Sequence, residues 1–205
     1  MKNIKTYNLF NESLKNKLKG KSEEELINEL EKLNIKDKIK TIIKYQLSYD
    51  LLPNNLTIDG NLRCSNYQLT SLPDGLTVYG DLHCSNNQLI SLPNNLIVHG
   101  SLYCSHNKIT KLPEDLIVMN SLFCYCNKLT SLPDNLFIHG RLWCQNNQLT
   151  FLPDNLIVHD SLACSYNKIT SLPDNLIVGE DLFCAHTLLP KNTKKPIGVK
   201  GQIKY

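Results

Sequence analysis

A cysteine recurs every 20 residues along most of this chain, and that period constrains the fold more than any other feature. A Leu-Pro pair recurs at the same interval, and seven copies follow one another without an insertion. The cysteines of the series are Cys64, Cys84, Cys104, Cys124, Cys144, Cys164 and Cys184. Self-similarity at a fixed short period indicates a solenoid, in which each repeat forms one coil and buries its apolar face against its neighbours.

The apolar residues inside each repeat alternate with other residues over short stretches. In the third repeat Leu96 and Val98 form one such pair, and Leu102 and Cys104 form another. A period of two predicts a short strand with one buried face, so each coil should contribute two strands. Between the strands, the repeats carry Gly60, Gly80, Gly100, Asn120, Gly140 and Asp160. Because these residue types tolerate a positive φ, we expect a sharp bend with positive φ at this position.

A recurrent asparagine marks another corner of the coil. The interior repeats carry it as Asn87, Asn107, Asn127, Asn147 and Asn167, whereas the first repeat has Tyr67 and the seventh has Thr187. A buried asparagine can bond the backbone of the adjacent coil through both its amide and its carbonyl group. We therefore expect an asparagine ladder that is intact only in the interior repeats.

The segment L-x-C-x-x-N-x-L, followed by L-P, resembles the conserved segment of leucine-rich repeats. The 20-residue period and the L-P-x-x-L corner resemble the short LPX subclass found in bacterial type III secreted effectors, and the V-x-G-x-L part is similar to repeats of phage and giant-virus proteins. The resemblance implies a leucine-rich repeat solenoid of the α+β class, a parallel β-ladder of seven coils with an N-terminal helical cap. Some of those effectors carry a ubiquitin-ligase domain beyond the repeats, but few residues follow the repeats here, so we do not expect that activity.

The chain is expected to divide into a helical N-terminal cap over residues 1–50, seven repeats over residues 51–190, and a basic C-terminal cap or tail over residues 191–205. Ser22 and Glu25 form a helix-capping pair in the first segment. In the last, Ile197, Val199 and Ile203 are candidates for a final strand. Charge follows the same division. Residues 1–44 hold 11 lysines and 7 acids, a net +4, residues 45–190 hold 6 basic and 12 acidic residues, a net −6, and the tail holds 5 lysines and no acid, a net +5.

The cysteine series is expected to be core rather than a chemical site. Each cysteine follows an inward leucine by two residues, and a straight ladder of thiols does not offer zinc a tetrahedral set of ligands. Cys126 occupies a corner instead, so we expect it to be the most exposed and reactive thiol, with its redox state left open. His139 and His159 could share a metal, but no carboxylate or cysteine is in register, so we favour solvated histidines. No nucleotide-binding or hydrolase motif occurs, and we predict no enzyme activity, no metal and no cofactor.

The position between the central leucine and the cysteine gives the strongest functional signal, because the repeat fixes none of its residues. It holds Arg63, His83, Tyr103, Phe123, Trp143, Ala163 and Phe183. Aromatic residues and arginine dominate binding hot spots. We predict a protein-interaction scaffold that binds a partner through this stripe, at Arg63, His83, Tyr103, Phe123, Trp143 and Phe183. A polar rim of Asn61, Asp81, Ser101, Ser121, Arg141, Ser161 and Asp181 flanks it. The alternative is cross-strand stacking that only stabilises the sheet.

A second outward stripe is expected on the other strand ladder. After Thr57 and Thr77 it becomes apolar, with Ile97, Ile117, Phe137, Ile157 and Ile177. An apolar stripe exposed to water promotes association or aggregation. It therefore either packs against the chain's own cap or tail, or is a second interface with a copy or a partner. This stripe is the basis of the alternative function, a structural or self-assembling repeat protein such as a phage component.

The expected partner is a protein of unspecified identity, with a second copy of the chain as a further candidate. The basic ends are interpreted as solvated lysines, so nucleic acid is not the expected partner. No apolar run reaches the length of about 18 residues that a membrane span needs, and residues 1–10 lack the apolar core of a signal peptide. The expected location is the cytoplasm, or a host cell reached without a classical signal peptide, with the cysteines as thiols.

Overall fold

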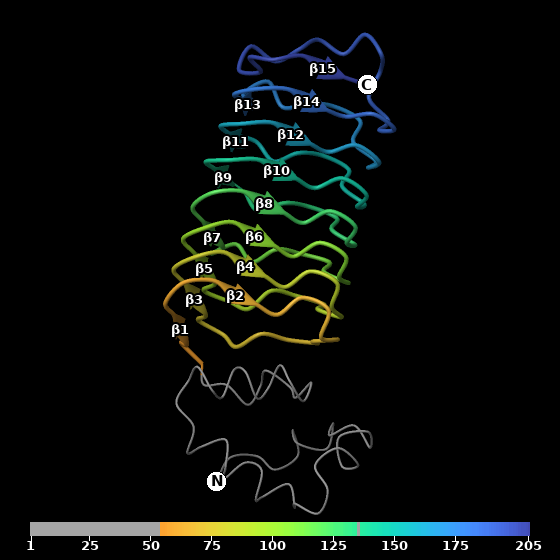
Figure 1. Ribbon diagram of the computed structural model, residues 1–205. Helices are drawn as coiled ribbons and strands as arrows, with labels where there is room; N and C mark the ends of the chain where they lie inside the picture. The colour runs from red at the N-terminus through yellow and green to blue at the C-terminus, as the bar shows by residue number, and fades with distance from the viewer. Residues whose placement is uncertain (1–53, 135) are drawn as a thin grey trace, which may run out of the picture. The chain divides into compact units, whose positions relative to one another are not determined.

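The computed structural model describes residues 54–134 and 136–205, so the predicted helical cap over residues 1–50 lies outside the described residues. From Asn54 onward the chain winds into coils that are stacked in sequence order, each forming one layer of a parallel β-solenoid (Figure 1). The solenoid of seven coils predicted from the 20-residue period is confirmed.

Each of the seven coils contains two strands of two residues. The first strands are β1 (Thr57–Ile58), β3 (Thr77–Val78), β5 (Ile97–Val98), β7 (Ile117–Val118), β9 (Phe137–Ile138), β11 (Ile157–Val158) and β13 (Ile177–Val178). The second strands are β2 (Leu62–Arg63), β4 (Leu82–His83), β6 (Leu102–Tyr103), β8 (Leu122–Phe123), β10 (Leu142–Trp143), β12 (Leu162–Ala163) and β14 (Leu182–Phe183). One residue of each strand is buried and the other faces outward, as the alternating pattern predicts.

The second strands form one sheet along the whole described solenoid. With β15 (Ile203–Lys204) they make eight parallel strands in the order β15-β14-β12-β10-β8-β6-β4-β2, which we call the continuous ladder. The first strands form two separate sheets, β1-β3-β5-β7 and β9-β11-β13, which we call the divided ladder. Residues pair with their equivalents 20 positions away, as Leu102 does with Leu82 and Leu122. Each repeat position therefore becomes a column of side chains.

The core consists of the inward leucine, valine and cysteine columns. In the third coil Leu96, Val98, Leu102 and Cys104 are fully buried. Burial stabilises each aliphatic side chain by about 1.5–3 kcal/mol, whereas ordering one residue costs about 1–2 kcal/mol in backbone entropy alone. A single coil of 20 residues cannot offset its own ordering, so the stacking of coils is what makes each one stable.

The interior asparagines form the predicted ladder. The side-chain amide of Asn107 donates to the carbonyl oxygens of Cys84 and Cys104, at 3.0 and 3.1 Å, and its Oδ1 accepts from the Leu89 N–H at 3.0 Å. The same three bonds recur at Asn87, Asn127, Asn147 and Asn167. In the seventh coil Thr187 bonds groups of its own coil instead. Each asparagine therefore joins two coils at a buried corner.

The positive φ expected at the glycines between the strands is wrong for all but one of them. Gly60 has a φ of 95°, but the equivalent residues of the following coils are not in the left-handed region. Left-handed residues lie instead at the two outer corners. They are Asn55, Gly75, Asn95 and Asn155 before the first strand, and Asn66, Gln68, Asn86, His106, Cys126, Asn146, Tyr166 and His186 after the second.

Crowding, rather than φ, explains the glycines between the strands. A Cβ on Gly80 would overlap Oδ1 of Asn61 and would lie 2.7 Å from the carbonyl carbon of Gly60. Asn61 Oδ1 is held there because it accepts a hydrogen bond from the Asp81 N–H at 2.8 Å. A Cβ on Gly100 would likewise overlap Oδ1 of Asp81.

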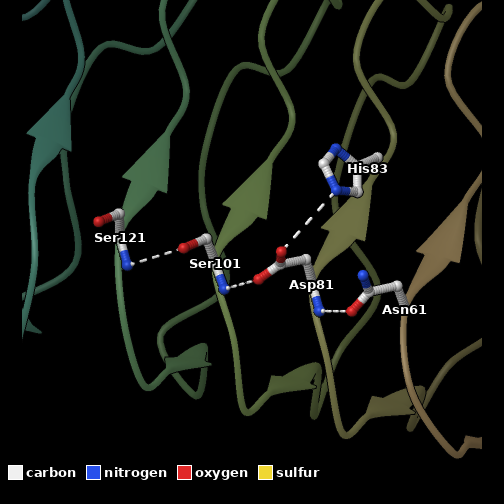
Figure 2. A network of polar contacts seen from close by, with 5 residues as sticks. All are labelled: Asn61, Asp81, His83, Ser101 and Ser121. Carbon is white, nitrogen blue, oxygen red and sulfur yellow. Dashed lines mark hydrogen bonds and ion pairs between the residues drawn. The ribbon is translucent and has the colours of Figure 1, made fainter.

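The polar rim thus forms a second column of hydrogen bonds between coils, which we call the rim ladder (Figure 2). Asp81 Oδ1 accepts from the Ser101 N–H at 2.8 Å, Ser101 Oγ accepts from the Ser121 N–H at 3.4 Å, and Ser121 Oγ accepts from the Arg141 N–H at 3.0 Å. The position between the strands is not glycine in two coils where the rim residue of the previous coil is a weak acceptor or none. Asn120 stands one coil after Ser101, which makes the longest of these bonds. Asp160 stands one coil after Arg141, whose side chain has no acceptor.

We expect Gly140→Ala to destabilise the protein by about 1–3 kcal/mol, because the new Cβ overlaps Ser121 Oγ. Ser121→Ala removes that oxygen, so the double variant should be more stable than the sum of the two single changes predicts, by about 1 kcal/mol. Urea denaturation of the four proteins measures this coupling. Additive free energies of unfolding would show that glycine is not selected by the rim ladder.

The C-terminal segment adds part of an eighth coil. Ile203 pairs with Leu182 through β15, and Val199 forms a bridge with Val178, so these two residues extend the two ladders. Ile197 does not join them, and its prediction as a strand residue is wrong. Pro196 is buried in its place, and Ile197 is 95% exposed.

Candidate functional site

The variable outward residues of the continuous ladder lie in one column. Each strand places its second residue outward, and the register pairs His83 with Arg63 and Tyr103, and Phe123 with Tyr103 and Trp143. The column continues through Ala163 and Phe183 to Lys204 of β15. We call the column from Arg63 to Phe183 the aromatic row. All of its residues that the sequence predicts as partner-binding are therefore brought together on one face.

The rings of the aromatic row pack against one another. His83 and Tyr103 stack with centroids 4.4 Å apart and planes at 4°, and Tyr103 and Phe123 stack at 4.7 Å and 10°. The stacking ends at Trp143, whose ring meets Phe123 edge-on at 5.1 Å and 88°. The rings are partly exposed, because each neighbour covers one of their faces. The stacking itself stabilises the sheet, since an aromatic pair contributes about 0.5–1.5 kcal/mol beyond its buried area.

His83 lies at one end of the stack in a mixed electrostatic environment. Burial lowers its pKa most, and the Arg63 guanidinium lowers it further, while the Asp81 carboxylate opposes them. Its Nε2 lies 4.0 Å from Asp81 Oδ2, too far for a hydrogen bond, and this buried nitrogen has no hydrogen-bond partner (Figure 2). The imidazole is therefore neutral near pH 7 and serves as an aromatic ring of the stack.

The rim beside the row is less available to a partner than the sequence suggests. The side chains of Asn61, Asp81 and Ser121 accept backbone hydrogen bonds from the next coil. Ser161 differs, because its Oγ donates to Glu180 Oε2 at 2.8 Å. Arg141 differs as well, because its side chain has no acceptor. Arg141 is exposed and lies two residues before Trp143. The Arg141 side chain makes no contact in the rim ladder, so its guanidinium remains available at the centre of the face.

Tyr125 and Gln145 belong to the same face but were missed by sequence reasoning. They occupy the next outward column, where Ser65, Ser85, Ser105 and Ser165 stand in other coils. The Tyr125 ring lies 6.5 Å from that of Trp143, and Gln145 Oε1 is buried without a hydrogen-bond partner. The signal was the loss of serine in two adjacent coils. Together with Trp143 and Arg141, these residues concentrate the large side chains of the face in the fourth and fifth coils.

The second stripe faces outward from the divided ladder. Ile97 and Ile157 are partly buried, whereas Ile117, Phe137 and Ile177 are 42%, 42% and 40% exposed. Phe137 contacts the rings of His139 and His159, with centroids at 4.6 and 5.1 Å. The stripe therefore leaves more apolar surface in solvent than the aromatic row does.

The cysteine series lies in the core. Its seven thiols are 0–1% exposed, and no cysteine in the described residues forms a disulfide. Burial raises the pKa of Cys104 to about 12 and that of Cys184 to about 11. Cys126 is partly exposed, as expected of a corner residue. Burial raises its pKa as well, so less of it is thiolate at neutral pH than of an ordinary cysteine, which argues against high reactivity.

Metal ligands do not gather in the part of the chain that the structure describes. The rings of His139 and His159 are 5.3 Å apart, but no group of three or more His, Cys, Asp or Glu side chains there could hold an ion. Over the same residues, no helix is long and apolar enough to cross a membrane.

Comparison with known proteins gives a structural match without a sequence match. No protein-family model matches the chain, and no curated protein matches it. Among solved structures, YopM from Yersinia enterocolitica WA-314 superimposes with a TM-score of 0.51 at 26% sequence identity, covering 71% of this chain and 33% of that chain. A second YopM structure, described as a leucine-rich effector protein from Yersinia pestis, covers 89% of this chain and 76% of that chain at 17% identity. Its TM-score of 0.33 is too low to support an argument. The chain thus spans a third of the length of the first YopM structure that it matches.

Proposed function

Since the chain is a leucine-rich repeat solenoid, we propose that it is a protein-interaction scaffold whose partner binds across the aromatic row. The observation that carries the proposal is the concentration of large side chains in the fourth and fifth coils. Phe123 and Trp143 lie there in the aromatic row, beside Tyr125 and Arg141, which replace the smaller residues of their own columns. The repeat needs none of them. Tyrosine, tryptophan and arginine are the residue types enriched in binding hot spots.

The geometry favours recognition of a protein surface over chemistry. The rings are held by stacking on a rigid sheet, so little side-chain entropy remains to be lost when a partner covers them. Trp143 stands at the end of the stack and next to the small Ala163, so its indole has one side that no ring covers. An aromatic anchor beside an exposed arginine suits a partner with an apolar side chain and a carboxylate.

The similarity to YopM from Yersinia enterocolitica supports the repeat fold on which this proposal is based. We propose that the chain acts as a scaffold in the cytoplasm or inside a host cell. The proposal excludes catalysis as the main role, because the motifs for it are missing from the sequence.

The test compares capture of proteins from a cell lysate by wild type and by Trp143→Ala/Phe123→Ala. Loss of two hot-spot rings should weaken the specific partner by about 30-fold or more. Phe151→Ala is the matched control, because Phe151 is an exposed ring at a corner of the coil, 49% exposed, outside the aromatic row. Trp143 is the chain's one tryptophan, so binding of the purified partner should also shift the intrinsic fluorescence. Full affinity in the folded double variant would refute the proposal.

The second candidate is a structural protein that associates with its own copies through the second stripe. The observation in its favour is the exposure of Ile117, Phe137 and Ile177 on one ladder. This candidate predicts that the protein associates with its own copies, and that variants of the aromatic row associate as strongly as wild type.

A further inference from the structure

The divided ladder is interrupted between β7 and β9. In the third and fourth coils the Ile97 N–H donates to the Leu76 carbonyl at 3.0 Å, and the Ile117 N–H donates to the Leu96 carbonyl at 3.1 Å. In the fifth coil β9 is not paired with β7, and the two strands end separate sheets. The coils stay joined beside the gap, because the Gly140 N–H donates to the Asn120 carbonyl at 3.1 Å.

The corner before β7 differs from that of the third coil. Its counterpart there is the left-handed Asn95, but Asp115 does not adopt that conformation. The Leu116 N–H closes a turn onto the Pro113 carbonyl at 3.3 Å, and Leu176 makes the same turn in the seventh coil. Leu116 is partly exposed, whereas Leu96 and Leu176 are fully buried, so the turn alone does not account for the exposure.

A groove of about 220 Å³ with a mixed apolar and polar lining lies beside the interruption. Its apolar lining includes Leu116, Ile117, Met119 and Phe137, and the last three are 42%, 44% and 42% exposed. Glu114 and Asp134 lie on its border, and Asp115 is next to them in sequence. Lys111 pairs with Glu114 at 2.9 Å, so the border keeps a net negative charge. The groove therefore suits an aliphatic side chain flanked by cations.

The C-terminal segment of this same chain presents such a group. Ile197 is 95% exposed, in the sequence Lys-Lys-Pro-Ile-Gly-Val-Lys. The buried Pro196 and the bridge from Val199 to Val178 hold it in a fixed place on the solenoid. Residues 191–205 contain five lysines and no acid. Of these, Lys204 is paired with Asp181, and Lys195 Nζ donates to the Gly201 carbonyl at 3.1 Å. Lys194 and Lys200, on either side of Ile197 in the sequence, are left to meet an acidic surface.

We propose that two copies of the chain form an antiparallel, two-fold symmetric dimer, in which Ile197 of each copy enters the groove between β7 and β9 of the other. Lys194 and Lys200 then face the acids at the border of that groove. Ile197 and the groove belong to the same ladder, since Val199 bridges to β13, so both contacts can form at once between two facing surfaces. A pair of contacts on one face closes into a dimer rather than growing into a filament. The proposal does not depend on the aromatic row.

Sedimentation velocity of the full chain between about 1 µM and 1 mM tests the proposal. We expect a single associated species of twice the 23.3 kDa chain mass. Ile197→Ser should weaken the association at least 10-fold, and circular dichroism should show an unchanged fold because the side chain is in solvent. Ile90→Ser is the matched control, since Ile90 is also an exposed isoleucine, at 63%, but lies away from the groove. It should dimerise like wild type.

A charge exchange tests the pairing itself. Asp134→Lys and Lys194→Asp should each weaken the dimer several-fold. The two together should restore part of the loss, because the exchanged charges again attract each other across each contact. A chain that is monomeric at 1 mM would overturn the proposal. So would equal behaviour of Ile197→Ser and wild type, a continuous increase in mass without a limiting dimer, or the absence of rescue in the double variant.

Discussion

Raising the pH from 8 to about 10 should unfold this protein at room temperature, although it is expected to be stable near neutrality. The cause is the column of buried thiols. Burial raises the pKa of Cys84, Cys104, Cys124, Cys144 and Cys164, and for Cys104 the value is about 12. In the unfolded chain these thiols titrate near their ordinary pKa of about 8.5.

The direction of the effect follows from the protons bound in each state. Below a pH of about 8 both states keep the thiols protonated, so the stabilisation by burial is complete. Cys184 behaves in the same way, because burial raises its pKa to about 11. Above a pH of about 9 the unfolded chain therefore releases six protons that the folded chain retains, and stability falls by about 1.4 kcal/mol per thiol and pH unit. Six thiols together give a slope of about 8 kcal/mol per pH unit, which exhausts an ordinary stability of 5–15 kcal/mol within one or two units.

Urea denaturation at a series of pH values measures this slope. Cys104→Ala/Cys124→Ala removes two of the six thiols, so it should lower the slope by about a third, whatever its stability at pH 7. Cys126→Ala is the control, because that thiol is partly exposed and should change the slope much less. A slope that is the same in the double variant and in wild type would assign the alkaline transition to other groups.

The second large effect is expected for Asn147→Leu. Leucine has a similar volume but leaves the Leu129 N–H without its partner. The carbonyl oxygens of Cys124 and Cys144 each lose one of two donors and keep their bonds from Asn127 and Asn167. An unsatisfied buried group costs about 1–3 kcal/mol and each further lost bond about 0.5–1.5 kcal/mol, so the total loss is on the order of 2–6 kcal/mol. Because the coil lies inside the array, the loss should also weaken the coupling between the coils on either side of it.

Gln148→Ala provides a neighbouring control, since Gln148 is exposed and only its backbone takes part in the ladder. The midpoint and the m-value of urea denaturation should both be reported. A fall in the m-value of Asn147→Leu would show that the coils no longer unfold as one unit. A loss below 1 kcal/mol would mean that water replaces the asparagine at this corner.

Much of the fold could be predicted because the repeat turns local pattern into long-range structure. Once Cys104 is known to recur at 20 residues, the register of every strand follows, and so does the inward direction of Leu102 and Val98. The columns of the aromatic row and of the second stripe followed from the same period, and the structure places their residues side by side.

The errors occurred where one residue's role depends on its neighbour in the next coil. Gly80 was interpreted as a residue with positive φ, but it is glycine because Asn61 fills the space above it. Asn61 itself was interpreted as a free rim residue. The interruption lies beside the corner that contains Asp115, a residue type that sequence patterns allow in either conformation. Pairwise crowding and backbone choice of this kind leave no periodic signal.

The contrast between the two ladders has a mechanical consequence. The continuous ladder joins all seven coils, whereas the divided ladder is interrupted between β7 and β9 (Figure 1). The solenoid should bend most easily at this interruption, with the continuous ladder as the hinge line. Curvature of this chain should therefore change mainly between the fourth and fifth coils, while the blocks on either side move as stiff bodies. A partner spread over the continuous ladder on both sides of that line would set the angle between them.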